Sequence, residues 1–261
     1  MSEGNFTVSQ DDAIALLTLD RAEKRNALSP ATLQQLKGIA EDLREQPDIR
    51  AVIIRAVGKD FSVGADLGTM ASRPEPTVQI RRTAELGMRL MRALREIPQP
   101  VICAVQGIAT GGATCIATAC DFRIGASDAR VGYGEVKLGI NLMWNALPLA
   151  IQTVGLARAK RMVMTGALFD AQTMVDWGFF DQLVAPGEQD AAAMALATQF
   201  AALPPIAVQM IKRSANAWAG ALDASIMHAD ADQWLLATRT DDFKEGITAF
   251  FERRPATFTG S

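Results

Sequence analysis

Histidine, tyrosine and cysteine are scarce in this chain of 261 residues, which contains one histidine (His228), one tyrosine and three cysteines. No CxxC pair occurs, so the ligand spacing of a zinc site is missing, and we expect no metal centre. The cysteines, Cys103, Cys115 and Cys120, are odd in number and share one apolar segment. This pattern predicts reduced, buried thiols in a cytoplasmic protein rather than a disulfide framework. With one histidine, we interpret His228 as solvated or structural rather than catalytic.

A strong charge of either sign is also missing. The formal net charge is −3, from 26 basic and 29 acidic residues, so nothing pulls the whole molecule toward nucleic acid or an anionic membrane. An anionic ligand would need a local basic patch. Two long uncharged runs, residues 97–120 and 138–157, are interrupted by Pro, Gly, Gln or Asn, and turns inside lipid leave backbone groups unsatisfied. They therefore predict buried strand-turn-helix segments, not membrane spans.

Apolar runs and helical periodicity alternate along the first part of the chain. Strands or extended pieces are predicted at residues 6–8, 13–19, 51–57, 101–105, 122–124, 131–133 and 180–184. Helices are predicted at residues 29–46, 77–96, 112–118, 143–154, 157–165, 170–177, 188–202, 205–218, 221–237 and 241–253. Strands alternating with helices predict an α/β fold with an open sheet. Late helices without a core of their own favour an oligomer surface.

A glycine pair, Gly111 and Gly112, lies between a buried strand-like run and a helix-like run, and Glu135 follows among glycines and apolar residues. Glycine lets a backbone approach a ligand closely and aim its N–H groups at it. Such donors with one carboxylate are the minimum for moving a proton next to a carbonyl. The alternatives are close packing of a helix on a strand, and a surface ion pair between Glu135 and Lys137.

Ten short motifs, in order along the chain, resemble the crotonase (enoyl-CoA hydratase/isomerase) superfamily. They are residues 20–28 (DRAEKRNAL), 61–67 (FSVGADL), 106–112 (QGIATGG), 120–123 (CDFR), 134–135 (GE), 138–139 (LG), 155–159 (GLARA), 165–166 (TG), 177–181 (WGFFD) and 250–254 (FFERR). The resemblance covers residues 8–260. Each motif is weak alone, but their shared order makes the resemblance specific.

The resemblance implies a spiral of ββα repeats followed by helices that trimerise, often as two stacked trimers. We therefore expect a core at residues 1–195, holding the CoA and active sites, and a helical oligomerisation region at 196–261, in a homotrimer or hexamer. Members bind acyl-CoA thioesters as substrates, and we expect no further cofactor. The residues expected to contact CoA are Arg21, Lys24, Arg25, Ala27, Val63, Ala65, Asp66 and Leu67. The backbone N–H groups of Ala65 and Gly112 are implied to hold the thioester oxygen.

One departure from the family pattern bears on the reaction. Hydratases of the family use two glutamates, and here Cys115 stands at the first position while Glu135 keeps the second. A single base that removes a proton at one carbon and returns it two carbons away needs no second carboxylate. We therefore expect double-bond isomerisation through a thioester enolate, with Glu135 as acid and base. Cys115, Met143 and Trp144 are expected to line the acyl pocket.

Three alternatives remain open at this stage. Another crotonase reaction, such as thioester hydrolysis or decarboxylation, fits the same motifs. A non-catalytic acyl-CoA-binding protein fits the loss of the first glutamate, although a pure binder needs no carboxylate facing the α-carbon. Among single residues, Cys115 is more simply an inert buried thiol than a nucleophile, because no basic residue adjoins it, and Met143 and Trp144 fit plain core packing as well.

Overall fold

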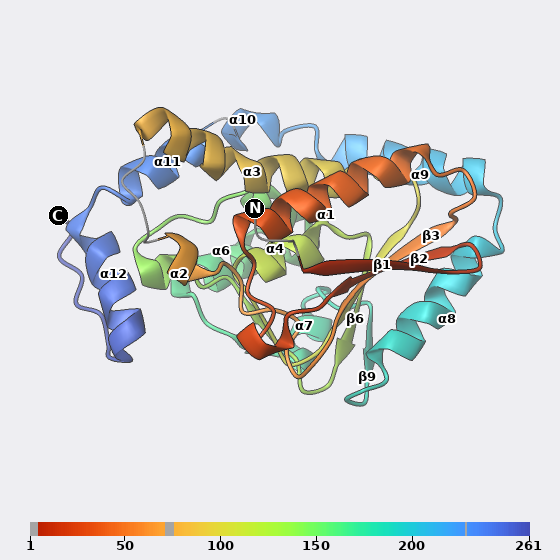
Figure 1. Cartoon of the computed structure of the whole chain (residues 1–261), viewed down its shortest axis with the longest axis horizontal. Coiled ribbons are helices and arrows are strands. Elements are labelled where there is room, and N and C mark those ends of the chain that lie inside the picture. The colour runs from red at the N-terminus through yellow and green to blue at the C-terminus, as the bar shows by residue number, and fades with distance from the viewer. Residues whose placement is uncertain (1–4, 71–75, 228) are drawn as a thin grey trace.

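The computed structural model describes residues 5–70, 76–227 and 229–261 (Figure 1). His228 lies outside these ranges. The strands are β1 (Phe6–Asp11), β2 (Ile14–Leu19), β3 (Ala51–Ala56), β4 (Val101–Val105), β5 (Ile108–Thr110), β6 (Phe122–Ala126), β7 (Arg130–Gly132), β8 (Phe169–Asp170) and β9 (Gln182–Val184). The α-helices are α1 (Pro30–Asp42), α2 (Leu67–Met70), α3 (Thr77–Arg95), α4 (Gly112–Ala119), α5 (Ala146–Val154), α6 (Leu156–Thr165), α7 (Ala171–Asp176), α8 (Gln189–Ala201), α9 (Pro205–Ala219), α10 (Ala224–Met227), α11 (Asp230–Ala237) and α12 (Asp241–Glu252). Short 3₁₀ turns are η1 (Ala22–Lys24), η2 (Leu43–Glu45) and η3 (Glu135–Leu138).

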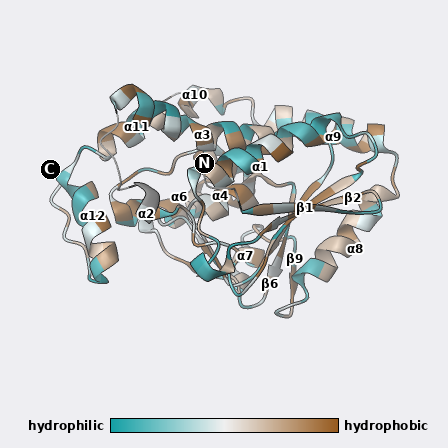
Figure 2. Ribbon diagram, viewed as in Figure 1, coloured by the Kyte–Doolittle hydropathy of each residue, from teal (hydrophilic) through white to brown (hydrophobic). Residues whose placement is uncertain are grey.

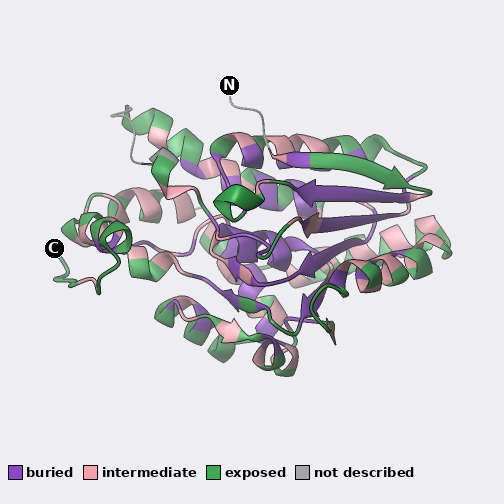
Figure 3. Ribbon diagram, turned by 60° about the horizontal axis from the view of Figure 1, so that its bottom comes forward, coloured by how far each residue is buried: buried purple, intermediate pink, exposed green. Residues whose placement is uncertain are grey.

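A six-stranded sheet in the order β1-β2-β3-β4-β6-β9 forms the centre of the fold. β1 pairs antiparallel with β2, and every later pair in this sheet is parallel. Parallel strands covered on both faces need apolar side chains on both sides, which explains the uninterrupted apolar run of β4. Figure 3 shows the inner strands as buried and β1 as largely exposed. The edge strand therefore carries the alternating, more polar sequence.

Helices cover the two faces of this sheet unequally. One face, with Ile53 and Ile102, packs against α8 through Ala193 and Ala197. The opposite face belongs to a much larger apolar cluster that takes in α1, α3, α4 and α5. Side chains alternate between faces along a strand, so Val52 and Ile54 join the larger cluster while Ile53 joins the smaller. The elements that carry the candidate site lie on the side of the larger cluster.

A second sheet, in the order β5-β7-β8, begins directly after β4. The chain turns between the two sheets at Gly107, which has φ +52°, and an ideal Cβ there would lie 2.2 Å from the Lys59 carbonyl oxygen. Only glycine fits this conformation and this close approach. The turn leads β5 straight to Gly111 and Gly112 at the start of α4. The glycine pair therefore lies at the end of β5, an edge strand of the second sheet.

The sequence-based prediction of an α/β fold with later helices is confirmed, with local differences. The predicted helix at 29–46 begins as expected, with the Ser29 side chain accepting a hydrogen bond from the Thr32 N–H, but its α-helical part ends at Asp42. The predicted helix at 221–237 is divided into α10 and α11. β5 and β8 were not predicted. No single helix among the described residues is long and apolar enough to cross a membrane, and one pair, α8 with α9, passes only as a combination bent by 110°.

Candidate active site

Glu135 begins the η3 turn, and its carboxylate lies against the glycine pair. An ideal Cβ on Gly111 would be 3.2 Å from Glu135 Oε1, and Gly111 has φ +57°. Any side chain at residue 111 would crowd the carboxylate and strain the backbone. Gly111 therefore lets the chain pass close to Glu135 before α4 begins.

The Glu135 carboxylate is poorly solvated, and no ion pair offsets its charge among the described residues. The residue as a whole is partly exposed, but its Oε2 is buried and has no hydrogen-bond partner among the described residues. Burial raises the pKa of Glu135 to about 7, against the lowering effect of a backbone hydrogen bond. Within the described part of the chain Lys137 makes no ion pair with it, so a surface salt bridge does not explain this residue. A carboxyl group with this pKa exchanges protons readily near neutral pH.

Cys115, on α4, lies in the same buried region and is 1% exposed. The pKa of its thiol is raised well above the usual range, first by burial and then by the negative charges of Glu135 and Asp230. The thiol is therefore neutral. A neutral buried thiol is a poor nucleophile, which supports the simpler interpretation of Cys115 as an inert group.

The two predicted backbone donors belong to segments that run side by side. Ser62 forms a parallel bridge with Ala109, and its carbonyl oxygen accepts a hydrogen bond of 3.2 Å from the Thr110 N–H. Gly64 has φ +82°, and an ideal Cβ there would be 2.6 Å from the Thr110 carbonyl oxygen and 3.5 Å from the Gly112 nitrogen. The chain just before Ala65 therefore lies next to the Gly112 N–H.

Neither of these N–H groups donates a hydrogen bond within the part of the chain that the structure describes. Gly112 is the first residue of α4, so its N–H has no partner inside the helix. Among the described residues, no acceptor bonds to the N–H of Ala65 or of Gly112. Ala65 is exposed, whereas Gly112 is buried. The joint use of these donors by one substrate oxygen stays a prediction.

The predicted CoA-binding loop is held together by ion pairs of its own. Arg21 pairs with Asp66 at 2.9 Å, and Arg25 pairs with Asp60 at 2.8 Å. Lys24 is exposed and makes no ion pair within the described ranges. The charges of the two arginines are thus partly offset. Lys24 is the cation of this loop whose charge no ion pair offsets within the described ranges.

The remaining predicted loop residues line the same segment. Ala27 is buried, whereas Val63 and Leu67 are partly exposed. Asn26, which was not predicted, is 1% exposed and has φ +57°. Its side chain accepts from the Arg21 N–H and donates to the carbonyl oxygens of Val57 and Asp60. Asn26 therefore fixes the loop, and its place between Arg25 and Ala27 in the motif was the available signal.

Trp144 packs directly beside the glycine pair, and its role as a wall of the acyl pocket stays a prediction. An ideal Cβ on Gly112 would be 2.5 Å from Trp144 Cη2, and one on Gly87 of α3 would be 2.0 Å from Trp144 Cδ1. The indole therefore fills the space left by two glycines on neighbouring helices. Met143 is partly exposed in the same segment. Neither Gly87 nor Asp230, whose charge reaches Cys115, was predicted.

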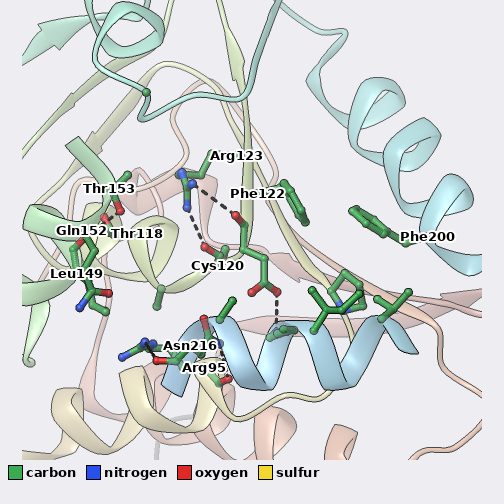
Figure 4. A pocket seen from close by; sticks show the side chains of 18 of the residues that line it. Arg95, Thr118, Cys120, Phe122, Arg123, Leu149, Gln152, Thr153, Phe200 and Asn216 are labelled. Carbon is green, nitrogen blue, oxygen red and sulfur yellow. Dashed lines mark hydrogen bonds and ion pairs between the residues drawn. The ribbon is translucent and has the colours of Figure 1, made fainter. Parts of the chain in front are cut away.

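A cavity of about 600 Å³ lies elsewhere, between α9 and the end of α4 (Figure 4). Its charged lining residues already have partners. Lys212 pairs with Asp121 at 2.6 Å, and Arg95 pairs with Asp223 at 3.2 Å. Glu135 and the glycine pair do not line this cavity. We therefore centre the candidate active site on Glu135 and Gly112 rather than on this cavity.

Comparisons with known proteins agree on one family. The family model described as enoyl-CoA hydratase/isomerase matches residues 9–261. A crotonyl-CoA hydratase of Syntrophomonas wolfei is 31% identical over 259 residues, which cover 99% of both chains. A short-chain-enoyl-CoA hydratase of Clostridium acetobutylicum is 29% identical over 255 residues, 97% of each chain. The similarity extends along essentially the whole chain.

Solved structures lead to the same conclusion. An enoyl-CoA hydratase from Mycobacterium avium subsp. paratuberculosis superposes with a TM-score of 0.89 at 25% identity, over 98% of this chain and 99% of that one. An enoyl-CoA hydratase from Bacillus anthracis superposes with a TM-score of 0.79 at 30% identity, over 98% of this chain and all of the other. This chain belongs to the enoyl-CoA hydratase/isomerase family of the crotonase superfamily.

Proposed function

We propose that this protein moves the double bond of an enoyl-CoA thioester, with Glu135 as its single acid–base group. The observation that carries the proposal is the Glu135 carboxylate, which is partly desolvated, has no ion-pair partner among the described residues and lies against Gly111 with a pKa of about 7. The carboxylate takes a proton from the α-carbon of a 3-enoyl thioester. The electron pair moves into a dienolate, and Glu135, whose proton exchanges with solvent, then delivers a proton to the γ-carbon. The product is the 2-enoyl thioester.

The developing negative charge in this reaction falls on the thioester oxygen. We assign its stabilisation to the N–H groups of Ala65 and Gly112. Each such donor contributes on the order of 3 kcal/mol in other oxyanion holes. Gly112 also opens α4, so the helix dipole adds to the donor. The unused state of both N–H groups in the described structure supports this assignment.

Isomerisation is favoured over hydration because Glu135 alone does not supply the two carboxylates that hold and polarise a water nucleophile. Hydration requires a water held and polarised by two carboxylates, and here the position of the first carboxylate is taken by the neutral thiol of Cys115. The names of the relatives favour hydration instead, since the S. wolfei and C. acetobutylicum proteins are called hydratases. Hydration is therefore the second candidate. Thioester hydrolysis, decarboxylation and acyl-CoA binding without catalysis are further alternatives.

A substrate panel decides between these functions. The wild-type protein is incubated in deuterium oxide with 2-enoyl-, 3-enoyl- and 3-hydroxyacyl-CoA, and products and deuterium content are followed by mass spectrometry. We expect conversion of 3-enoyl-CoA, deuterium at the α- or γ-carbon and little hydration of crotonyl-CoA. Glu135→Gln should abolish the exchange, whereas Cys115→Ala should change its rate by less than about tenfold because a neutral thiol transfers no proton here.

The contrary results are equally clear. Efficient hydration by the wild type, or exchange that survives Glu135→Gln, would overturn the single-glutamate mechanism. Tight binding of acyl-CoA without exchange on any enoyl-CoA would indicate a binding protein.

We also propose that the protein works in the cytoplasm, because its three cysteines are free and buried.

A further inference from the structure

Trp144 and Asn145 hold two consecutive left-handed backbone conformations. Their φ angles are +65° and +57°. Asparagine tolerates this region, but a bulky residue such as tryptophan rarely adopts it. Such strain persists only where surrounding contacts fix the backbone. Something in the fold must therefore hold this turn, which carries the indole against Gly112.

The side chain of Asn145 is not what holds the turn. Asn145 is 7% exposed, and its Oδ1 has no hydrogen-bond partner among the described residues. The backbone N–H of Asn145 instead donates to Asp230 Oδ2 at 2.7 Å. A short bond to a carboxylate is among the stronger hydrogen bonds in proteins. Beyond the turn's own hydrogen bond, from the Ala146 N–H to the Met143 carbonyl oxygen at 3.1 Å, the restraint on the turn comes from Asp230, 85 residues further along the chain.

Helix α11 is anchored where this bond requires it. Asp230 is the first residue of α11, and its backbone carbonyl oxygen also accepts a hydrogen bond of 3.4 Å from the Asn141 side chain. Two residues later, Asp232 pairs with Arg81 of α3 at 2.7 Å. The helix that supplies the carboxylate is thus tied both to the turn and to α3. α3 is also the helix that receives the indole, at Gly87.

We propose that Asp230 is a positioning residue of the acyl-CoA site, which holds the Trp144–Asn145 turn so that the indole limits the acyl chains the site accepts. The inference rests on the proposed acyl-CoA function. An acyl chain whose carbonyl oxygen is bound by the Gly112 N–H must pass the indole that packs at Gly112. Release of the turn frees that space. The site in wild-type protein therefore suits short acyl groups, and loss of the Asp230 bond relaxes this preference.

The test compares acyl-chain preference across variants by isothermal titration with saturated, unreactive acetyl-, butyryl-, hexanoyl- and octanoyl-CoA. Asp230→Ala should shift the ratio of octanoyl- to butyryl-CoA affinity by about tenfold toward the longer chain, the discrimination typical of pocket contacts with a few methylenes. Asp230→Asn keeps an acceptor oxygen and should retain the wild-type preference. Asp241→Ala, which removes an exposed ion pair with Lys244 on the neighbouring helix α12, is the matched control and should also retain it.

A double-mutant cycle shows whether Asp230 acts through Trp144. Trp144→Ala should relax the preference as Asp230→Ala does, and Asp230→Ala should add nothing in the Trp144→Ala background. A matching loss in Asp230→Asn would mean that the charge acts rather than the hydrogen bond, and would overturn the proposal. Equal shifts in Asp241→Ala, or additive effects of Asp230→Ala and Trp144→Ala, would overturn it as well.

The proposed function and this inference fail in different ways. If the wild type binds no acyl-CoA more tightly than CoA itself, the proposed function fails and the specificity role fails with it. The positioning itself is judged without ligand, from acrylamide quenching of the Trp144 fluorescence, taken as the difference between each protein and its Trp144→Phe counterpart. Asp230→Ala should increase this quenching and Asp230→Asn should not. Normal acyl-CoA binding with unchanged quenching and unchanged chain preference in Asp230→Ala would overturn the inference alone.

Discussion

A carboxylate that is removed from water opposes folding when it ionises, so Glu135 should make the stability of this protein depend on pH. Its pKa rises from 4.5 to about 7 in the folded protein because of burial. Folding therefore favours the protonated group. The protein is relatively more stable below pH 4.5, and this stability is lost as the pH rises through 7. Catalytic groups commonly lower stability in this way.

We predict that Glu135→Gln stabilises the protein at pH 8 and has a smaller effect at pH 5. At pH 8 the gain should be about 2 kcal/mol, since one pKa unit corresponds to 1.36 kcal/mol and partial solvation reduces the full shift. Urea unfolding of both proteins at the two pH values measures the difference. An equal gain at both values would show that the carboxyl group is not desolvated. Glu188→Gln, at an exposed site before α8, provides the control.

At the scale of elements, the contact between α3 and α4 depends on two glycines that leave room for one indole. Gly87 lies inside α3, where a glycine ordinarily weakens a helix. A Cβ there would lie 2.0 Å from both Cδ1 and Nε1 of Trp144. Glycine at this position therefore weakens α3 but leaves the space that the Trp144 indole fills. Gly38 in α1 offers a contrast, because a Cβ there would meet nothing within 4 Å.

We expect Gly87→Ala and Gly38→Ala to act in opposite directions. Gly38→Ala should stabilise the protein by about 0.5–1 kcal/mol through helix propensity. Gly87→Ala should destabilise it by about 1–3 kcal/mol, because the indole is forced from its place. Chemical denaturation of the two variants measures both changes. In a Trp144→Ala background the cost of Gly87→Ala should disappear, and its persistence there would mean that another contact opposes the Cβ.

The sequence was informative where a pattern is local and failed where it is not. Ser29 and Pro30 correctly predicted the start of α1. The apolar runs predicted the bounds of β3 and β4 to within one residue. β5 was missed because its three residues lie among glycines that suggested a ligand loop, and β8 has only two residues. Glu135 was recognised from its motif. The link between Asp230 and Asn145 joins residues far apart in the sequence, so periodicity and motif order carry no sign of it.

At the scale of the whole molecule, helices α11 and α12 contact the candidate site of their own chain. α12 packs on η3, the turn that begins with Glu135, so closely that a Cβ on Gly246 would lie 2.8 Å from the Leu138 Cα. α11 supplies Asp230 to the Trp144–Asn145 turn. The predicted division at residue 195 therefore does not separate the site from the helical region. An oligomerisation role for the same region remains a prediction.

Helix α9 leaves an apolar stripe uncovered. The stripe consists of Ile206, Met210 four residues later and Trp218 a further eight residues on, all on the same side of the helix. Their exposed fractions are 74%, 63% and 85%. Figure 2 shows hydrophobic and hydrophilic stretches alternating along this helix. Leu222, just beyond it, is 81% exposed. Several large apolar side chains exposed along one helix often mark an interaction surface. A second copy of the chain would cover it and remove the apolar area from water.

We therefore predict that the protein is a homotrimer or hexamer built mainly through the helices after Leu142, and that the α9 stripe takes part. Sedimentation velocity at micromolar concentration should show the trimer or hexamer for the wild type and a smaller species for the double variant Met210→Lys/Trp218→Lys, because lysines cannot be buried in an apolar contact without a partner. Val8→Lys places the same charge on the exposed edge strand β1 and should leave assembly intact. A stable wild-type monomer would refute the prediction, and an intact trimer in the double variant would place the interface on another face of these helices.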